Sequence, residues 1–382
     1  MQVNIDINNI PRTIDLVRDD SNTSVIPDGY PVLSIIDQTQ LPYAEAYLHL
    51  RDWREAIEAI KQLKVRGAPA IGIAGAASVA LAAAEFCATN EGIARDEMNN
   101  PADYLEFMRQ AAERIAHARP TAVNLMHMVD AAMEIVEEEA VSGSSPVVIA
   151  DKLYEFTKRL IVEDEDANRK MGELGAALLE ERSSVLTHCN AGSLATAFFG
   201  TALGVIYEAA LQGKIEMVYA DETRPLRQGA RLTATVCRDM GFDVTVISDN
   251  MPAFVMQREG VDVFTTAADA ICCDGHVVNK VGTFQNAIVA KYMGIPYFVT
   301  GAPDQGHPTV DTVHIEMRDP NFTLQAMGVR TAAEGVKGYY PAFDITPPHL
   351  VSGVVTDLGI YSPYDLHRYF TDGHIDEHNL VV

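Results

Sequence analysis

The chain has 382 residues, of which 53 are acidic and 29 are basic, so its formal net charge is −24. Sequence-independent binding to nucleic acid depends on Lys and Arg that neutralise phosphates, and the composition therefore argues against nucleic acid and an anionic membrane surface as partners. At about 150 residues per domain, the length predicts two or three domains. An acidic chain that binds a phosphorylated metabolite must gather a few cations in one place, so the positions of the arginines are informative.

The cysteines and the N-terminus indicate a reduced, cytoplasmic protein. The five cysteines are odd in number and irregular in spacing, which is not typical of a disulfide framework. The first ten residues, M-Q-V-N-I-D-I-N-N-I, lack the charged and apolar regions of a signal peptide. The longest uncharged apolar run, 68–84, falls short of the roughly 20 residues of a membrane span, so we expect no association with a membrane.

The first half of the chain predicts a mostly helical domain. Residues 1–50 contain short apolar or alternating runs between turn residues, which predict a few short strands such as 32–36. Apolar residues then recur at helical spacing and predict helices over 53–64, 70–87, 101–118, 121–140, 147–162 and 166–181. The Gly and Ala content of the second helix predicts close packing against another element. We place this N-terminal domain at residues 1–165.

The second half alternates between strand-like and helical segments. The predicted strands are 184–188, 215–220, 242–248, 262–265, 270–273 and 296–300. The predicted helices are 192–212, 227–240, 251–257 and 283–293. This alternation is typical of βαβ units and predicts an α/β fold with a doubly wound, mainly parallel sheet in a C-terminal domain over 166–382.

Cys189 lies in T-H-C-N-A-G-S-L-A-T (187–196), directly after a predicted buried strand. Ligands of open α/β sheets bind beyond the carboxyl ends of strands, and a helix start lowers the pKa of a thiol. A small buried residue in a tight turn is an equally good interpretation, and a Cys–His hydrolase dyad is a third. His188 is a poor base for such a dyad, because successive strand residues face opposite sides of the sheet.

Arginines precede two predicted helix starts. Arg66 opens R-G-A-P (66–69), and Arg119 opens R-P-T-A-V-N (119–124). The free N–H groups of a helix start bind phosphate together with a neighbouring cation, although a solvated arginine at a turn is the structural alternative. A further polar cluster, E-T-R-P at 222–225 followed by Arg227, Gln228 and Arg231, comes after the strand 215–220. Capping and surface charge would also explain that cluster.

Asp269 is flanked by apolar residues in A-A-D-A-I-C-C (267–273). Apolar surroundings raise the pKa of a carboxyl, so we expect Asp269 to act as a general acid, with a turn or capping role as the alternative. Lys280, at the end of the same segment, is a natural partner for phosphate. We expect no metal site: Cys272 and Cys273 fit packing, and the histidine pair of H-I-D-E-H (374–378) lies where chain ends fray.

Taken in order, these segments resemble the methylthioribose-1-phosphate isomerases of methionine salvage. The resemblance extends over nearly the whole chain, and it includes ribose-1,5-bisphosphate isomerases and the regulatory subunits of the eukaryotic translation-initiation exchange factor as relatives. The matching segments are V-R-G-A-P-A-I-G-I-A (65–74), R-P-T-A-V-N-L (119–125), L-T-H-C-N-A-G-S-L-A-T (186–196), E-T-R-P-L-R-Q-G-A-R-L-T-A (222–234) and N-K-V-G-T (279–283).

The resemblance implies an aldose–ketose isomerase that converts 5-methylthioribose 1-phosphate into 5-methylthioribulose 1-phosphate in methionine biosynthesis. It further implies a helical N-terminal domain, a Rossmann-like C-terminal domain, a homodimer, and no metal or organic cofactor. Hydrogen would move from C2 to C1 through an enolate or as a hydride. By the same resemblance, the catalytic residues are Cys189 and Asp269, and the substrate-binding residues are Arg66, Gly67, Ala68, Arg119, Gln228, Asn279 and Lys280.

Two departures from the family's usual sequence concern specificity. The family has an arginine after the aspartate where this chain has Ala270, and often an apolar residue where this chain has Arg227. An isomerase of 5-deoxyribose 1-phosphate or ribose 1,5-bisphosphate is therefore an alternative. A non-catalytic subunit that senses sugar phosphates is an alternative of a different class.

Overall fold

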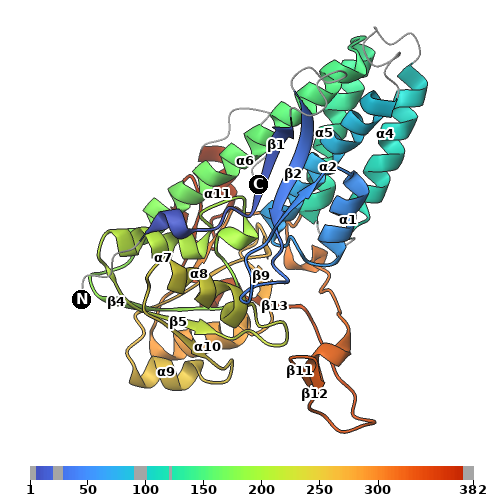
Figure 1. The fold of residues 1–382 in the computed structure, drawn as a ribbon. Helices are drawn as coiled ribbons and strands as arrows, with labels where there is room; N and C mark the ends of the chain where they lie inside the picture. Colours follow the sequence, from blue (N-terminus) through green and yellow to red (C-terminus); the bar gives the residue numbers. More distant parts are fainter. Residues whose placement is uncertain (1–5, 20–28, 90–100, 120–122, 373–382) are drawn as a thin grey trace. The chain divides into compact units, whose positions relative to one another are not determined.

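The computed structural model describes residues 6–19, 29–89, 101–119 and 123–372 (Figure 1). Within them, the chain forms two compact units. The unit that we call the helical unit comprises residues 11–166 and 194–198. The unit that we call the sheet unit comprises residues 6–10, 167–193 and 199–372.

The helical unit combines a small antiparallel sheet with long helices, as predicted. Its sheet has the order β1-β2-β3, and the strand bounds are β1 Ile14–Asp19, β2 Tyr30–Ile36 and β3 Tyr47–Leu50. Its helices are α1 Trp53–Lys61, α2 Ala68–Thr89, α4 Pro101–Ala116 and α5 Val123–Val141, followed by the first part of α6 Pro146–Ala176.

Helix α2 forms the centre of the helical unit, where it packs against α1, α4, α5 and β2. It is long and apolar enough to cross a membrane, but 89% of its most apolar window is buried inside the protein. A helix that is apolar on all sides is typical of a core. The predicted close packing is confirmed, because a Cβ added to Gly72 or Gly75 would lie 3.0 Å or 2.6 Å from α5 side chains.

The sheet unit is built on a seven-stranded sheet with the order β15-β14-β10-β7-β4-β5-β6. Every neighbouring pair is parallel except β14 with the edge strand β15. The internal strand β4 is buried along its whole length, as expected for a parallel sheet that is covered on both faces. The strand bounds are β4 Ser183–Thr187, β5 Ile215–Asp221, β6 Val244–Ile247, β7 Val263–Ala267, β10 Tyr297–Thr300, β14 Gly353–Val355 and β15 Ile360–Tyr361.

Helices and two smaller sheets complete the sheet unit. The helices are α7 Ala202–Leu211, α8 Ala234–Asp239, α9 Pro252–Arg258, α10 Thr283–Met293 and α11 His367–Asp372, and a π-helical turn spans Gly229–Thr233. A three-stranded antiparallel sheet has the order β13-β9-β8, with β8 Ala270–Ile271, β9 Val277–Lys280 and β13 Phe343–Thr346. The hairpin β11 Gln325–Ala326 and β12 Val329–Arg330 forms a separate two-stranded sheet.

The structure departs from the predicted elements at two joints. Helices predicted over 147–162 and 166–181 are one helix, α6. The predicted helix 192–212 is also wrong, because a 3-10 turn over Ser193–Ala195 precedes α7, which begins only at Ala202. Phe199 and Gly200 have φ values of 70° and 93°, which the right-handed helix excludes.

Candidate active site

The predicted site residues of the sheet unit come from neighbouring strand ends. Strand β4 lies between β7 and β5, and all three strands are parallel. Cys189 follows β4, Asp269 follows β7, and Glu222 follows β5. Parallel strands end at a common edge, so the polar residues of these three loops share the carboxyl edge of the sheet. This edge is where open α/β sheets bind ligands.

Cys189 is buried and held in a left-handed backbone conformation, with φ of 67°. Its N–H donates to Thr223 Oγ1 at 2.9 Å, and its carbonyl accepts from Thr233 Oγ1 at 2.6 Å. The prediction that an α-helix starts directly after Cys189 is wrong, since α7 begins at Ala202. Cys189 therefore does not lie at the start of an α-helix, and hydrogen bonds with two threonines fix its backbone.

Two buried amides, one next to Cys189 in the chain and one in the segment after β5, have polar atoms without a hydrogen-bond partner among the described residues. These atoms are Gln228 Oε1 and Asn190 Nδ2, and Thr233 Oγ1 lies 3.4 Å from the other amide atom of Asn190. An unsatisfied buried polar atom costs about 1–3 kcal/mol, so such atoms are typical of a site that a polar ligand completes. Gln228 was predicted to bind substrate. Asn190 was missed, although its place next to Cys189 was a usable signal.

The turn before the π-helix brings Gln228 close to β5. A Cβ added to Gly229 would lie 1.7 Å from the carbonyl oxygen of Asp221, an overlap that only glycine avoids. Forcing extra atoms into a packed position costs about 1–3 kcal/mol or more. Gly229 therefore allows the backbone after Gln228 to lie directly against the carboxyl end of β5.

Asp269 is exposed in the short connection between β7 and β8, where its N–H donates to the carbonyl of Val278 at 2.9 Å. The expectation that this carboxyl lies in apolar surroundings is therefore wrong. Its neighbours Ile271 and Cys272 are buried, but Asp269 itself lies before β8, outside that buried segment. Its carboxyl is open to solvent and to a ligand at the carboxyl edge.

Asn279 and Lys280 are buried at the end of β9. The Asn279 amide donates to Thr283 Oγ1 at 3.0 Å, which links it to the start of α10. The Lys280 ammonium donates to the carbonyl of Ala342 at 2.7 Å and lies 4.2 Å from the ring centre of Phe343. A carbonyl and an aromatic face compensate in part for the burial of an ammonium group.

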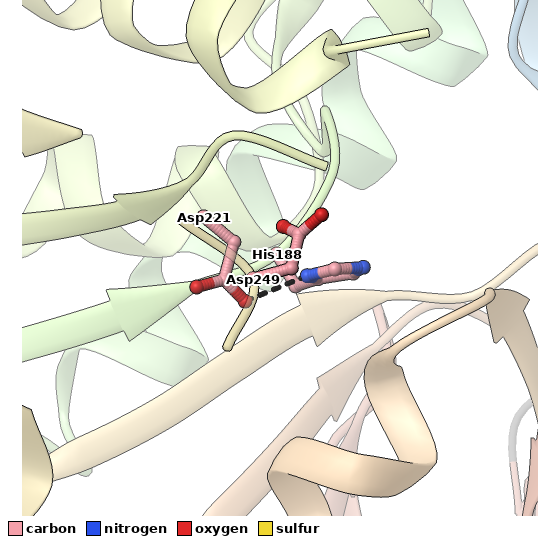
Figure 2. A group of neighbouring side chains, drawn as sticks. All are labelled: His188, Asp221 and Asp249. Atoms are coloured by element: carbon pink, nitrogen blue, oxygen red, sulfur yellow. Dashed lines mark hydrogen bonds and ion pairs between the residues drawn. The ribbon is translucent and has the colours of Figure 1, made fainter. Parts of the chain in front are cut away.

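His188, Asp221 and Asp249 form a polar cluster that the sequence analysis missed (Figure 2). His188 Nδ1 lies 2.7 Å from Asp221 Oδ2, and Nε2 lies 3.0 Å from the carbonyl oxygen of Val281. Both oxygens of Asp249 accept backbone N–H groups, from Thr223 at 2.7 Å and Arg224 at 2.6 Å. Both imidazole nitrogens and both Asp249 oxygens take part in these contacts, so the cluster forms a hydrogen-bond network.

His188 and Asp221 together carry one more proton than a neutral imidazole and an ionised carboxylate would, because both ring nitrogens contact oxygen atoms. The Val281 carbonyl only accepts, so Nε2 must carry hydrogen, and the contact between Nδ1 and Asp221 then needs a second one. Burial lowers the pKa of His188, but the hydrogen bond and charge of Asp221 outweigh it, so that pKa is raised. Burial raises the pKa of Asp221 despite the opposing effect of His188. The pair therefore keeps its shared proton.

An open depression of about 530 Å³ lies beside this network in the sheet unit. Its lining contains none of the predicted site residues, so the depression is distinct from the predicted catalytic position. It borders Val281, whose carbonyl accepts the hydrogen bond from His188 Nε2. The lining residues are Arg224, Asp249, Val281, Gly282, Phe284, Gln285, Ile288, Val289 and Asp344.

The other predicted substrate-binding residues belong to the helical unit. Arg66 and Gly67 directly precede α2, and Ala68 is its first residue, so the predicted helix start is confirmed. Gly67 has φ of 97°, and a Cβ there would lie 2.3 Å from the carbonyl oxygen of Ala195. Arg119 is half-buried after α4, and the residues 120–122 that follow it lie outside the described part of the chain. The H-I-D-E-H segment (374–378) lies outside it as well.

Known proteins resemble this chain over most of its length. A family model described as "Initiation factor 2 subunit family" matches residues 64–363. A protein of Heliobacterium modesticaldum named methylthioribose-1-phosphate isomerase is 42% identical, over 87% of this chain and 93% of that protein. A protein of Desulforudis audaxviator with the same name is 40% identical, over 87% and 92% of the two chains.

Two solved structures carry different names. A 5-methylthioribose 1-phosphate isomerase from Pyrococcus horikoshii has a TM-score of 0.83 at 33% identity and covers 98% of this chain and 100% of that one. A structure from A. fulgidus described as translation initiation factor eIF-2B, subunit delta, has a TM-score of 0.76 at 40% identity, over 93% and 97% of the two chains. The matched span and these similarities show that this chain belongs to the Initiation factor 2 subunit family.

Proposed function

We propose that this chain is an aldose–ketose isomerase that converts 5-methylthioribose 1-phosphate into 5-methylthioribulose 1-phosphate. The observation that carries the proposal is its 40–42% identity, over 87% of its length, to two proteins that are named for this reaction. The sheet unit supports it independently, because a buried thiol and an exposed carboxyl follow adjacent parallel strands. We place the reaction in methionine salvage.

The chemistry requires an acid at the ring and a second group at C2. The phosphate on C1 prevents the sugar from opening by itself, so we propose that Asp269 protonates the ring oxygen while its bond to C1 breaks. Hydrogen then moves from C2 to C1, and C2 becomes the ketone. Cys189 takes the proton released at C2 or stabilises the charge that develops there. The exposed position of Asp269 lets it regain a proton from water after each turnover.

The remaining predicted residues would bind the substrate. We propose that the unpaired Oε1 of Gln228 accepts a hydrogen bond from a sugar hydroxyl. We also propose that Lys280 contributes positive charge for the phosphate. Asn279 positions the same segment through Thr283. From the helical unit, we propose phosphate contacts from Arg66, Arg119 and the backbone of Gly67 and Ala68 at the start of α2. The proposed reaction uses no metal or organic cofactor.

A non-catalytic, sugar-phosphate-sensing subunit is the second candidate. The 40% identity to a structure described as a subunit of a translation initiation factor favours it. A sensor needs a pocket for the sugar but no group that transfers protons. Cys189 and Asp269 therefore favour the isomerase, and turnover distinguishes the two functions.

We expect the purified protein to convert 5-methylthioribose 1-phosphate to the ketose. The phosphorus NMR signal should change from coupling with the single hydrogen on C1 to coupling with two. Comparing kcat/KM for the methylthio sugar, 5-deoxyribose 1-phosphate and ribose 1,5-bisphosphate identifies the preferred group at C5. Tight binding of these sugars without turnover would support the sensing subunit instead.

Replacing Cys189 with Ala should lower kcat by about 10²–10⁴-fold, the usual contribution of a positioned acid or base. The fold should persist, because the backbone of residue 189 keeps its bonds to Thr223 and Thr233. Cys273→Ala is the matched control, since this half-buried thiol donates to the Asp304 carbonyl and has no proposed role. Near-wild-type kcat in Cys189→Ala, measured with the NMR assay, would remove the thiol from the mechanism.

Asp269→Asn should also lower kcat by about 10²–10⁴-fold, because an amide cannot protonate the ring oxygen. The exposed Asp243 directly precedes β6, at the opposite end of the parallel strands, and provides a matched carboxyl-to-amide control. We expect Asp243→Asn to keep its kcat within about twofold. Equal losses in the two variants would show that general charge, rather than a specific acid, matters.

We propose that the protein is a homodimer in the cytoplasm. Helices α9 and α10 pack together and expose Phe254, Ile288 and Tyr292, apolar side chains that a second copy would bury. None of the five cysteines, all of which lie in the described residues, forms a disulfide, which suits a reducing compartment. Sedimentation should give twice the chain mass of 41.7 kDa, and a monomer at micromolar concentration would contradict the dimer. Cell fractionation tests the location.

A further inference from the structure

We infer that His188 and Asp221 form a positioning pair that fixes the Cys189 thiol relative to the substrate-binding segment Asn279–Lys280. The inference rests on the proposed isomerase function. It assigns no proton transfer with substrate to the imidazole, whose two nitrogens are both engaged elsewhere. The pair acts through the backbone segments that it joins.

A single imidazole connects three parts of the sheet unit. His188 directly precedes Cys189 after β4, and its Nδ1 contacts Asp221 at the end of β5 at 2.7 Å. Its Nε2 contacts the carbonyl of Val281, the residue directly after Lys280, at 3.0 Å. Cys189 is thus bonded to His188 itself, and Lys280 is bonded to Val281, whose carbonyl contacts the His188 ring. A shift of the ring changes the distance between them.

The ring has no room to shift without moving its neighbours. The exposed fractions of the His188 and Asp221 side chains are 1% and 0%. Gly282 has φ of 107°, and a Cβ there would lie 2.8 Å from His188 Cε1, so the turn after β9 packs directly on the ring. Interiors are close-packed and transmit small displacements.

Asp221 is itself fixed from two sides. Its Oδ2 accepts from the Asn286 amide of α10 at 2.5 Å, and its backbone carbonyl accepts from Thr223 Oγ1 at 3.1 Å. The same Thr223 hydroxyl accepts the N–H of Cys189 at 2.9 Å. Asp221 therefore supports Cys189 along two routes, through the imidazole of His188 and through Thr223.

The carboxyl-to-amide variant of Asp221 distinguishes positioning from general destabilisation. Asn at position 221 can donate an N–H to Nδ1 of a neutral imidazole, which leaves Nε2–H for Val281 and needs no shared proton. In the wild type the same Oδ2 also accepts from the Asn286 amide, so that amide must turn until its Oδ1, which has no partner among the described residues, accepts from the new NH2 group. Asp221→Asn should then keep the bridge, by which we mean the two contacts of the His188 ring with residue 221 and with Val281, whereas Asp221→Ala and His188→Ala break it. His276→Ala is the matched control, because His276 is half-buried and pairs with Asp274 at 3.0 Å in the same unit.

We expect His188→Ala and Asp221→Ala to lower kcat about 100-fold, the effect of a displacement of about 1 Å in a reacting group, with KM changed less than about threefold. Asp221→Asn should stay within about fivefold of wild type, and His276→Ala within about twofold. Thermal unfolding shows which variants fold. Wild-type kcat in His188→Ala, or an Asp221→Asn variant as impaired as Asp221→Ala, would overturn the inference.

The pH profile provides a second readout. The raised pKa of His188 means that the pair keeps its proton above the usual imidazole range and loses it as the pH rises further. Wild-type activity should therefore fall at high pH relative to Asp221→Asn, whose bridge needs no shared proton. The other charged groups that influence His188 or its turn are Asp249, Asp344 and Lys280, and they are unchanged in both proteins. A constant ratio of the two activities across pH would contradict a shared proton.

A further measurement distinguishes failure of the proposed isomerase function from failure of the positioning pair. If the wild type does not convert the sugar phosphate, the isomerase is wrong, and the bridge is then measured from the rate at which iodoacetamide alkylates Cys189. Mass spectrometry of the Cys189 peptide separates this thiol from the other four. His188→Ala should change that rate at least fivefold, with Asp221→Asn and His276→Ala close to wild type. Equal rates in all variants would overturn the positioning pair by itself.

Discussion

The hydrogen bond between His188 and Asp221 is the interaction on which the carboxyl edge of the sheet depends. Both side chains are buried, and Asp221 Oδ2 and the two imidazole nitrogens all have partners inside the protein. The carbonyl of Val281 can only accept a hydrogen bond, so Nε2 of His188 must carry a hydrogen. The contact between Nδ1 and Asp221 then needs a second proton, which the pair shares. That requirement fixes the ends of β4 and β5 and the turn after β9 relative to one another. Cys189 and Lys280 are located by the same constraint.

The parallel sheet explains why residues distant in sequence work together. Strand β4 is an internal strand of the sheet, buried along its length, with β5 and β7 as parallel neighbours. The loops after these strands share one edge, and a rigid scaffold presents them there. Close backbone approach at Gly229 and Gly282 lets those loops pack without space between them. The two groups that we propose to react differ in exposure: Cys189 is buried, whereas Asp269 is exposed.

The strands, most helices and the edge that carries the site were predictable, because periodicity reports which faces of an element are buried. The strand ends in turn place Cys189 and Asp269. The apolar sequence neighbours of Asp269 predicted a general acid, and the family resemblance implied the catalytic role of Cys189. Periodicity failed after Cys189, where backbone conformation rather than apolar spacing stops a helix. It also misplaced Asp269, because apolar sequence neighbours do not bury a residue in a turn. The bond between His188 and Asp221 joins residues 33 apart, and alternation shows only that His188 faces away from Cys189.

The family contains relatives with two kinds of name, so overall similarity leaves the chemistry to be decided at the carboxyl edge. The most direct test is a crystal structure of Cys189→Ala with 5-methylthioribose 1-phosphate. Our account predicts the sugar at this edge, with C2 beside residue 189, the ring oxygen near Asp269 and an intact bridge from His188 to Asp221 beneath it. A saturating ligand bound elsewhere, or a sugar whose reacting carbons lie away from both residues, would contradict the account.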